Sequence, residues 1–177
     1  MAKRAASKSI TKRKPAKNPP RKTKKRVQAV PDKYPAVGAY LRIKGAAGAI
    51  AWYMKVFGAK PRMRMDMPDG RVGHAELAIG KGLIMLADEF PEMNILGPKT
   101  LGGSSVTLHH YVRDVDAVIS GAVKQGAKIL RPISNEFYGD RAGTIEDPFG
   151  HVWMVQTHIE DVSAKEMKKR LNAMVAG

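Results

Sequence analysis

The spacing of apolar side chains changes repeatedly along the chain between the period of a strand and the period of a helix. Residues 37–43 alternate apolar with other side chains, as a half-buried strand does, and residues 46–57 gather apolar side chains on one helical stripe that ends at Gly58. Three further short strands are predicted at residues 60–67, 73–79 and 83–87, joined by glycine-containing turns. The first half therefore has the predicted order βαβββ.

The second half repeats this order. Residues 106–112 alternate like a strand, Asp114 is placed to cap a helix, and Gly126 closes that helix. Strands are predicted near residues 129–133, 143–146 and 151–157. The last segment, residues 163–175, begins with a Ser-x-x-Glu capping box and is expected to be a surface helix.

Sequence motifs recur at nearly the same spacing as the predicted elements. Arg71-Val72-Gly73-His74-Ala75-Glu76 is matched 70 residues later by Arg141-Ala142-Gly143-Thr144-Ile145-Glu146, and Gly58-Ala59-Lys60 is matched 68 residues later by Gly126-Ala127-Lys128. A repeat of this length is too long for a solenoid unit, so it indicates two half-domains that share a core. Because the two arginines recur with the scaffold, structural ion pairs are favoured for both, although Arg141 could instead hold a carboxylate or phosphate of a substrate.

Positive charge is concentrated at the N-terminus. Residues 1–30 hold 12 of the 31 Lys and Arg residues and no Asp or Glu, whereas residues 31–177 carry the other 19 with all 16 acidic residues. Residues 1–33 are therefore predicted to be a disordered basic tail, because they bring too few apolar side chains to repay ordering. Residues 3–26 could bind nucleic acid without sequence specificity; a solubilising tail or a targeting peptide are the alternatives.

The composition of the chain limits its possible covalent links, metal ligands and membrane contacts. The chain has no cysteine, which excludes disulfides and thiolate ligands and fits a reducing compartment. No apolar run approaches the length of a membrane span, so we expect a soluble, cytoplasmic protein that makes no membrane contact. The predicted organisation is a tail at residues 1–33, one domain at residues 34–160 with modules 35–90 and 104–160, and a C-terminal helix at residues 161–177.

The tandem halves and three local motifs together resemble a known superfamily. The motifs are Trp52-Tyr53-Met54-Lys55-Val56-Phe57-Gly58-Ala59, Val112-Arg113-Asp114-Val115-Asp116 and Asp147-Pro148-Phe149-Gly150-His151. They resemble the vicinal oxygen chelate superfamily of glyoxalases, bleomycin-resistance proteins and dioxygenases, and within it the PhnB-like group. The resemblance implies an α+β fold in which two βαβββ modules form a curved mixed sheet around a cavity, and a homodimer is expected.

The same resemblance places the usual metal ligands on the first, fourth, fifth and eighth strands. Counting from the turns puts Gly38, Ile84, Thr107 and Met154 at those positions. None of them is a His, Gln or Glu, and Gly and Ile have no side-chain donor for a divalent cation. The usual metal site is therefore predicted to be missing, and no cofactor is expected.

Strand alternation predicts which side chains line the cavity instead. These candidate ligand-binding residues are Tyr40, Arg42, His74, Glu76, Thr107, His109, Tyr111, Met154 and Gln156, and Ile84, Leu86 and His158 are expected to face the same way. His109 is the candidate general base. His110 is expected to be a packing residue, and His151, in the last turn, is expected to be exposed.

Three functional hypotheses follow. The first is a protein that binds a small organic molecule without a metal, as drug-sequestering members of the resembled superfamily do. The second is a metal-dependent lyase or dioxygenase in which His74, Glu76 and His109 form a relocated divalent-metal site. The third is a nucleic-acid-associated protein that binds through its basic tail.

Overall fold

The computed structural model describes residues 27–175. It divides into two units, residues 1–31 and residues 32–177, and every helix and strand given below lies in the second. The predictions of a disordered tail and of nucleic-acid binding through residues 3–26 concern residues that lie almost entirely outside the described part of the chain. None of the helices in residues 27–175 has the length and apolar character needed to cross a lipid bilayer.

The elements follow the order predicted from the sequence. The first module contains β1 (Ala39–Ile43), α1 (Ala46–Phe57), β2 (Lys60–Asp66), β3 (Val72–Ile79) and β4 (Gly82–Asp88). The second contains β5 (Thr107–Tyr111), α3 (Val115–Lys124), β6 (Lys128–Asn135), β7 (Asp140–Glu146) and β8 (Val152–His158). A final helix, α4 (Ala164–Val175), follows. The predicted α+β class and tandem βαβββ order are confirmed.

The strands form two four-stranded mixed sheets with equivalent topology. Their orders are β1-β4-β3-β2 and β5-β8-β7-β6, and in each sheet the first strand pairs in parallel with the fourth. The strands β1 and β5 are therefore free along one edge. The other pairings are antiparallel, and irregular register in β2 and β6 falls at the opposite edge of each sheet.

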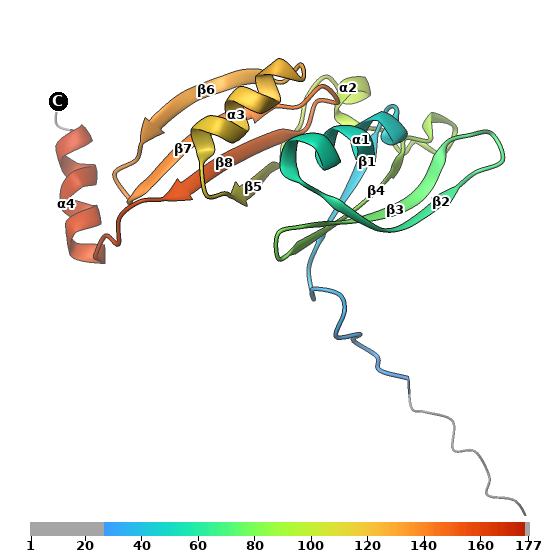
Figure 1. Ribbon diagram of the computed structural model, residues 1–177, viewed down its shortest axis with the longest axis horizontal. Coiled ribbons are helices and arrows are strands. Elements are labelled where there is room, and N and C mark those ends of the chain that lie inside the picture. Colours follow the sequence, from blue (N-terminus) through green and yellow to red (C-terminus); the bar gives the residue numbers. More distant parts are fainter. Residues whose placement is uncertain (1–26, 176–177) are drawn as a thin grey trace, which may run out of the picture. The chain divides into compact units, whose positions relative to one another are not determined.

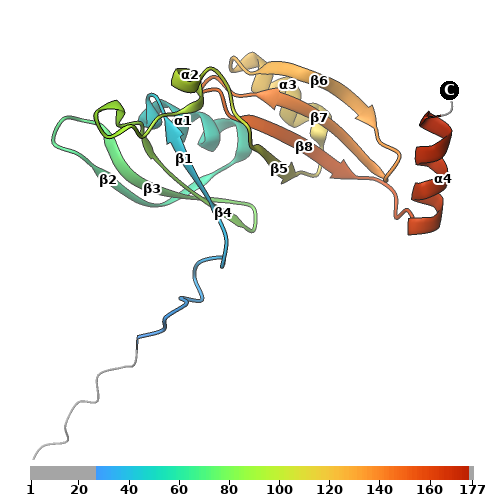
Figure 2. The same ribbon diagram turned by 180° about the vertical axis from the view of Figure 1, so that it is seen from behind.

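Each module covers one face of its sheet with its own helix. Helix α1 contacts the strands of the first sheet and α3 those of the second, and the two helices also contact each other (Figure 1). Seen from behind, the strands stand in front of these helices (Figure 2). We call the side covered by a helix the helix face and the other side the open face. Ile84 and Leu86 lie buried on the helix face with Leu41 and Ile43, so the prediction that these two residues face the same way as Tyr40 and Arg42 is wrong.

One buried carboxylate connects the two modules. Asp147 accepts hydrogen bonds from the Tyr53 hydroxyl of α1 at 2.6 Å and from Nε1 of Trp153 in β8 at 3.0 Å. Phe57 of α1 packs its ring against Trp153 at a centroid distance of 4.7 Å. Trp52 donates from Nε1 to the carbonyl of Gln125 just after α3. The end of α1 is therefore part of the core of both halves.

The segment between the modules has structure that periodicity did not predict. It contains a short 3₁₀ helix, η1 (Pro91–Met93), and a one-turn helix, α2 (Pro98–Leu101). Each begins with a proline, whose fixed φ suits a first helical position. Such single turns are too short to produce a hydrophobic period, which explains why the sequence pattern gave no sign of them.

Candidate functional site

The open face of the first sheet carries a connected group of polar side chains. The Tyr40 hydroxyl lies 2.9 Å from Nδ1 of His74, and the Arg42 guanidinium stacks over the Tyr40 ring at 4.3 Å. Nε2 of His74 lies 3.7 Å from Oε1 of Glu76, which also accepts a hydrogen bond from the Tyr34 hydroxyl at 2.8 Å. That hydrogen bond is the main reason that the pKa of Glu76 is lowered. The structure thus brings four predicted site residues together.

The open face of the second sheet carries the other predicted site residues. Thr107, His109 and Tyr111 of β5 stand beside Val152, Met154 and Gln156 of β8 in the parallel register. Gln156 is only 3% exposed, and its side-chain oxygen has no hydrogen-bond partner within the described part of the chain. Their positions are those expected from strand alternation, and their binding role stays a prediction.

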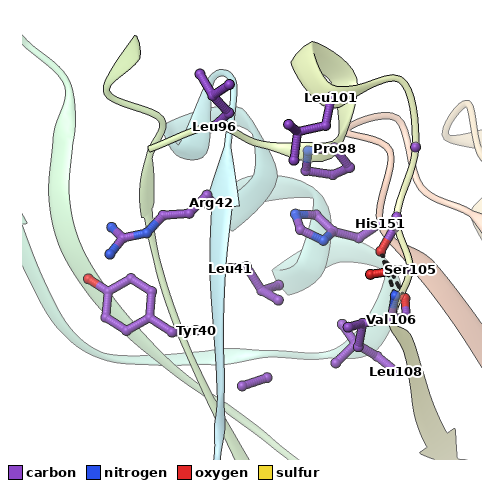
Figure 3. A pocket seen from close by; sticks show the side chains of 13 residues that line it. Tyr40, Leu41, Arg42, Leu96, Pro98, Leu101, Ser105, Val106, Leu108 and His151 are labelled. Carbon is purple, nitrogen blue, oxygen red and sulfur yellow. Dashed lines mark hydrogen bonds between the residues drawn. The ribbon is translucent and has the colours of Figure 1, made fainter. Parts of the chain in front are cut away.

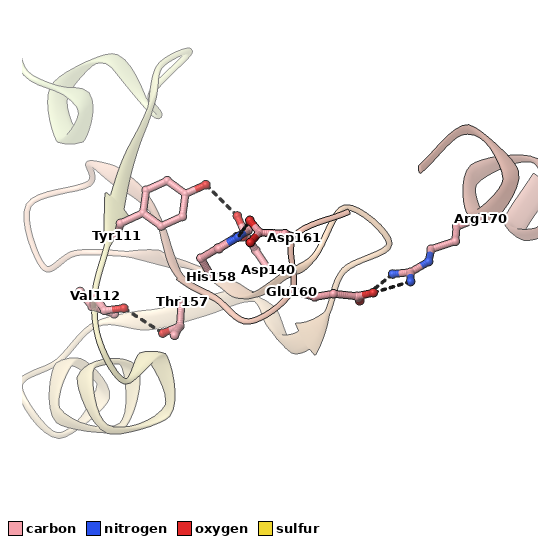
Figure 4. Close-up of polar contacts among 8 residues, drawn as sticks. All are labelled: Tyr111, Val112, Asp140, Thr157, His158, Glu160, Asp161 and Arg170. Atoms are coloured by element: carbon pink, nitrogen blue, oxygen red, sulfur yellow. Dashed lines mark hydrogen bonds and ion pairs between the residues drawn. The ribbon is translucent and has the colours of Figure 1, made fainter. Parts of the chain in front are cut away.

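At the far end of this face, Tyr111 joins a carboxylate network (Figure 4). Its hydroxyl donates to Asp140 at 2.7 Å, and the same carboxylate lies 2.7 Å from Nδ1 of His158. Nε2 of His158 lies 3.0 Å from Asp161, so the imidazole bridges two carboxylates. Hydrogen bonds to Asp161 and then Asp140 raise the pKa of His158. Tyr111 and His158 therefore already have strong partners.

The predicted metal triad does not form. Among residues 27–175, no three His, Asp or Glu side chains gather into a cluster that could hold a metal ion. His74 and Glu76 are neighbours, but His109 belongs to the other sheet and has Tyr111 as its ring contact, at a centroid distance of 6.2 Å. The prediction of a site that combines these three residues is wrong.

The four strand positions expected to carry the superfamily's usual ligands do not fit a divalent cation either. Ile84 is buried on the helix face, and Gly38 has no side chain. Thr107 and Met154 lie on the open face, but a thioether is too soft a ligand for Mg²⁺ or Mn²⁺, and one hydroxyl does not make a site. We therefore derive no chemistry from a metal at these positions.

Both arginines of the repeated motif form ion pairs with nearby carboxylates. Arg141 binds Asp116 through two nitrogens, each at 2.7 Å, and Arg71 binds Asp69 and Glu92. Glu146, the repeat partner of Glu76, lies within ion-pair distance of Lys99 and Lys128. The prediction of structural ion pairs for the arginines is confirmed.

A cavity of about 340 Å³ lies where β1 meets the connecting segment and β5 (Figure 3). We call it the junction cavity. Its wall is mostly apolar and comes from both modules and the segment between them. The apolar side chains are those of Leu41, Leu96, Pro98, Leu101, Val106 and Leu108. Tyr40 and Arg42 stand at its β1 side, and the His151 imidazole points into it (Figure 3).

The connecting segment forms one wall of this cavity because it passes very near strand β1 and the turn at Gly150. A Cβ at Gly97 would stand 2.6 Å from the Arg42 carbonyl oxygen, and a Cβ at Gly150 would stand 3.3 Å from Lys99 N and Pro98 Cβ. The buried carboxylate of Glu89 holds the segment in place, accepting from the amide of Gly97 at 3.0 Å and from Thr100 Oγ1. The hydrogen bond from Gly97 contributes most to the lowered pKa of Glu89.

His151 lies in an environment that differs from the one predicted from the sequence. It was expected to be exposed in a turn, yet only 7% of its surface is accessible. Asp147 fixes the turn by accepting from the amides of Phe149 and His151 at 2.9 and 3.0 Å. The turn is covered by a segment that is distant in sequence, so no local signal could have indicated the burial. The motif Asp147-Pro148-Phe149-Gly150-His151 marked the position but not its environment.

The buried imidazole has one free nitrogen. Nε2 of His151 has no hydrogen-bond partner among the described residues. Burial lowers the pKa of His151, and the opposing influences of Asp147 and of a hydrogen bond with the Arg42 backbone are smaller. At neutral pH the ring is therefore uncharged. A neutral imidazole with an unused nitrogen, beside a mostly apolar cavity that Tyr40 and Arg42 also line, is a suitable group for orienting a bound small molecule.

The fold is a duplicated α+β domain, and its junction cavity is lined by residues of both modules and of the segment between them. The model of the glyoxalase/bleomycin resistance protein/dioxygenase superfamily matches residues 36–155. An uncharacterized protein of Mycobacterium bovis, Mb0911c, is 36% identical over 146 residues, which is 81% of this chain and 96% of that protein. The chain belongs to this superfamily.

Solved structures share the fold at lower identity. Protein PA1353 from Pseudomonas aeruginosa gives a TM-score of 0.60 at 19% identity, covering 70% of this chain and 98% of its own. A Bacillus cereus protein described as a putative 3-demethylubiquinone-9 3-methyltransferase, PhnB protein, gives 0.57 at 18% identity, covering 70% and 99%. At these identities the likeness shows the fold alone.

Proposed function

We propose that this protein binds a small organic molecule in the junction cavity and that binding does not depend on a metal. The observation that carries the proposal is the buried His151 imidazole, whose Nε2 has no partner among the described residues, beside a mostly apolar cavity of about 340 Å³ that Tyr40 and Arg42 also line. Ligand sites typically range from about 300 to 1,000 Å³ and combine apolar walls with a few polar groups. The junction cavity has this composition.

The energetics of the imidazole support a ligand. A buried polar atom without a partner costs about 1–3 kcal/mol, so a molecule that supplies the missing hydrogen bond recovers part of that cost. The surrounding apolar wall adds the burial of the ligand's own apolar surface, at about 25 cal/mol per Å². Both contributions favour a compact, largely apolar ligand with one polar group facing His151.

The donor set argues against the metal-dependent alternative. The structure separates His109 from the His74 and Glu76 pair, and the four strand positions offer too few hard donors. Assignment to the PhnB-like group is part of this proposal; the sequence motifs and the fold shared with the Bacillus cereus protein support it. The homodimer, the cytoplasmic location and nucleic-acid binding stay predictions.

A thermal-shift screen of small fragments against EDTA-treated protein tests the proposal. Leu101 is 64% exposed and lines the cavity, so Leu101→Trp should fill the cavity without overpacking the core. The matched control is Leu130→Trp on β6, where the side chain is 52% exposed. Fragments should stabilise the wild type and Leu130→Trp but not Leu101→Trp. Hits that stabilise all three proteins equally would show that the junction cavity is not the binding site.

A further inference from the structure

Among the described residues that line the junction cavity, Arg42 is the one that carries a charge. The other polar groups are the hydroxyls of Tyr40, Ser104 and Ser105 and the neutral imidazole of His151, and the remaining lining residues are apolar. Tyr40 and Arg42 share the open face of β1, and the guanidinium lies beside the Tyr40 ring, away from His151 (Figure 3). The cavity therefore has a single positive charge, at its β1 side.

The guanidinium of Arg42 differs from those of the other half-buried arginines. Within residues 27–175, the arginines of intermediate exposure are Arg42, Arg71, Arg141 and Arg170. Each of the last three binds a carboxylate at 2.7 Å. Arg42 forms no ion pair with any described residue, and its guanidinium lies over the Tyr40 ring at 4.3 Å. A charged side chain that is partly removed from water is normally paired, so the exception needs an explanation.

The carboxylates around β1 do not supply the missing partner, because they already bind other groups. Glu76 accepts from the Tyr34 hydroxyl. Asp88 accepts from three backbone amides, and Glu89 accepts from one amide and a threonine hydroxyl. Within the described part of the chain, the guanidinium is thus left without an anion.

Stacking on an aromatic ring uses only the flat face of a guanidinium. The N–H groups lie in the guanidinium plane and stay free to donate, and their fork matches the two oxygens of a carboxylate. The Tyr40 hydroxyl lies 2.9 Å from Nδ1 of His74, which holds the ring on which Arg42 lies. A single positive charge suits a monoanion, whereas a phosphate dianion would need a second cation that the described lining residues do not provide.

We propose that the ligand of the junction cavity is a small organic carboxylate, whose anionic group pairs with the Arg42 guanidinium while its apolar body lies against the apolar wall. This inference rests on the proposed function and specifies its ligand class. It adds a charged group to the largely apolar ligand described above. Aryl and short-chain alkyl carboxylates meet the requirement, whereas neutral molecules of the same shape lack the charge.

Benzoate and benzamide are suitable probes, because they have nearly the same shape and only benzoate is charged at neutral pH. An apolar cavity of about 150 Å³ already holds benzene, so the junction cavity has room for either. In NMR titrations of the wild type, benzoate should bind about tenfold more tightly than benzamide. This factor is the lower end of the range for hydrogen bonds to a charged group, because Arg42 is only half-buried. Added salt should weaken benzoate binding and leave benzamide binding unchanged.

Replacing Arg42 tests whether its guanidinium causes this preference. Arg42→Gln removes the charge and keeps a polar side chain, so the affinity for benzoate should fall to that for benzamide. The matched control is Arg113→Gln, because Arg113 is exposed, lies outside the wall of the cavity and forms no ion pair among the described residues. The control removes the same net charge and should keep the preference. A preference that survives in Arg42→Gln, or that both variants lose equally, would refute the role of Arg42.

The comparison of the two probes in the wild type does not depend on how a variant folds. Equal affinities for benzoate and benzamide would overturn the carboxylate requirement and leave a working cavity. Failure of both probes while other fragments of the thermal-shift screen occupy the cavity would overturn it as well. Failure of the whole screen would overturn the proposed function itself.

Discussion

Replacing Tyr53 with phenylalanine removes the hydroxyl that ties the first module to the buried carboxylate of the second. Tyr53 is fully buried, and its hydroxyl donates to Asp147 at 2.6 Å. Burial, followed by the charge of Asp147, raises the pKa of this tyrosine well above its usual range, so it stays a neutral donor at any pH used in practice. Phenylalanine keeps the ring stacked against Phe57 and loses only the hydrogen bond.

The expected loss of stability depends on how many hydrogen-bond donors remain at the Asp147 carboxylate. A hydrogen bond to a charged group contributes about 1.5–3 kcal/mol. Asp147 keeps three other donors, Nε1 of Trp153 and the amides of Phe149 and His151, so the buried carboxylate stays largely hydrogen-bonded in the variant. We expect Tyr53→Phe to lower the free energy of unfolding by about 2 kcal/mol. For a folded unit of about 150 residues this corresponds to a fall in Tm of about 4–8 °C.

The assay is thermal unfolding followed by circular dichroism, with Tyr111→Phe as the matched control. That substitution also removes a tyrosine hydroxyl that donates to an aspartate, at 2.7 Å, but Tyr111 is 54% exposed. Asp140 is buried but keeps Nδ1 of His158 at 2.7 Å, and the half-exposed Tyr111 ring brings little burial, so the cost should be smaller than that of Tyr53→Phe, about 0.5–1 kcal/mol. If Tyr53→Phe lowers Tm no more than Tyr111→Phe does, the Asp147 carboxylate does not hold the modules together, and this account of the core is wrong.

Three other perturbations test the linker, the carboxylate network and the metal argument. Gly97→Ala puts a Cβ 2.6 Å from the Arg42 carbonyl oxygen, a backbone atom, and should lower the free energy of unfolding in urea by about 1–3 kcal/mol. The control, Gly73→Ala, meets a flexible methionine side chain at 3.0 Å and should lower it less. Equal losses in the two variants would contradict the close approach of the connecting segment to β1. His158 has a pKa raised above 6.5 by its two aspartates, so the stability that it contributes is complete below about pH 6.5 and is lost as the pH rises through the raised value. The Tm difference between wild type and His158→Gln should therefore shrink from mildly acidic to alkaline pH, and a difference that is constant or grows would refute the pairing. Mn²⁺, Zn²⁺ or Ni²⁺ added to EDTA-treated protein should leave Tm unchanged, because the strand positions offer too few ligands. A metal that did bind would stabilise the fold by about 2.7 kcal/mol at a hundredfold its Kd, and the resulting rise in Tm would contradict the metal argument.

Local sequence signals predicted most of the secondary structure. The helix expected at residues 46–57 is α1, and each predicted strand lies within three residues of its observed ends. Glycines in positive φ mark the ends of α1 and the turns, as at Gly58 and Gly150. These signals are reliable because periodicity, capping and turn chemistry depend on residues only a few positions apart.

The open faces were predicted with one error, and that error is instructive. Alternation correctly grouped Tyr40 with Arg42 and His74 with Glu76. It placed Ile84 on the same face because parity was counted from a turn, while the observed register pairs Tyr40 with Met85. A shift of one residue moves every side chain of a strand to the other face. The sequence therefore shows which side chains of one strand share a face, but only the pairing with the neighbouring strand shows which face that is.

The sequence by itself determined the superfamily and the duplicated βαβββ order, because both depend on residue type and short-range spacing. Only the tertiary structure decided that His109 stays apart from His74 and Glu76, and that His151 is buried. His151 became a candidate binding residue because the segment around Gly97 and Pro98 passes over its turn and because its Nε2 has no hydrogen-bond partner among the described residues. Burial and hydrogen-bond partners arise from segments far apart in the chain, and a pattern of neighbouring residues carries no information about which distant segment will cover it.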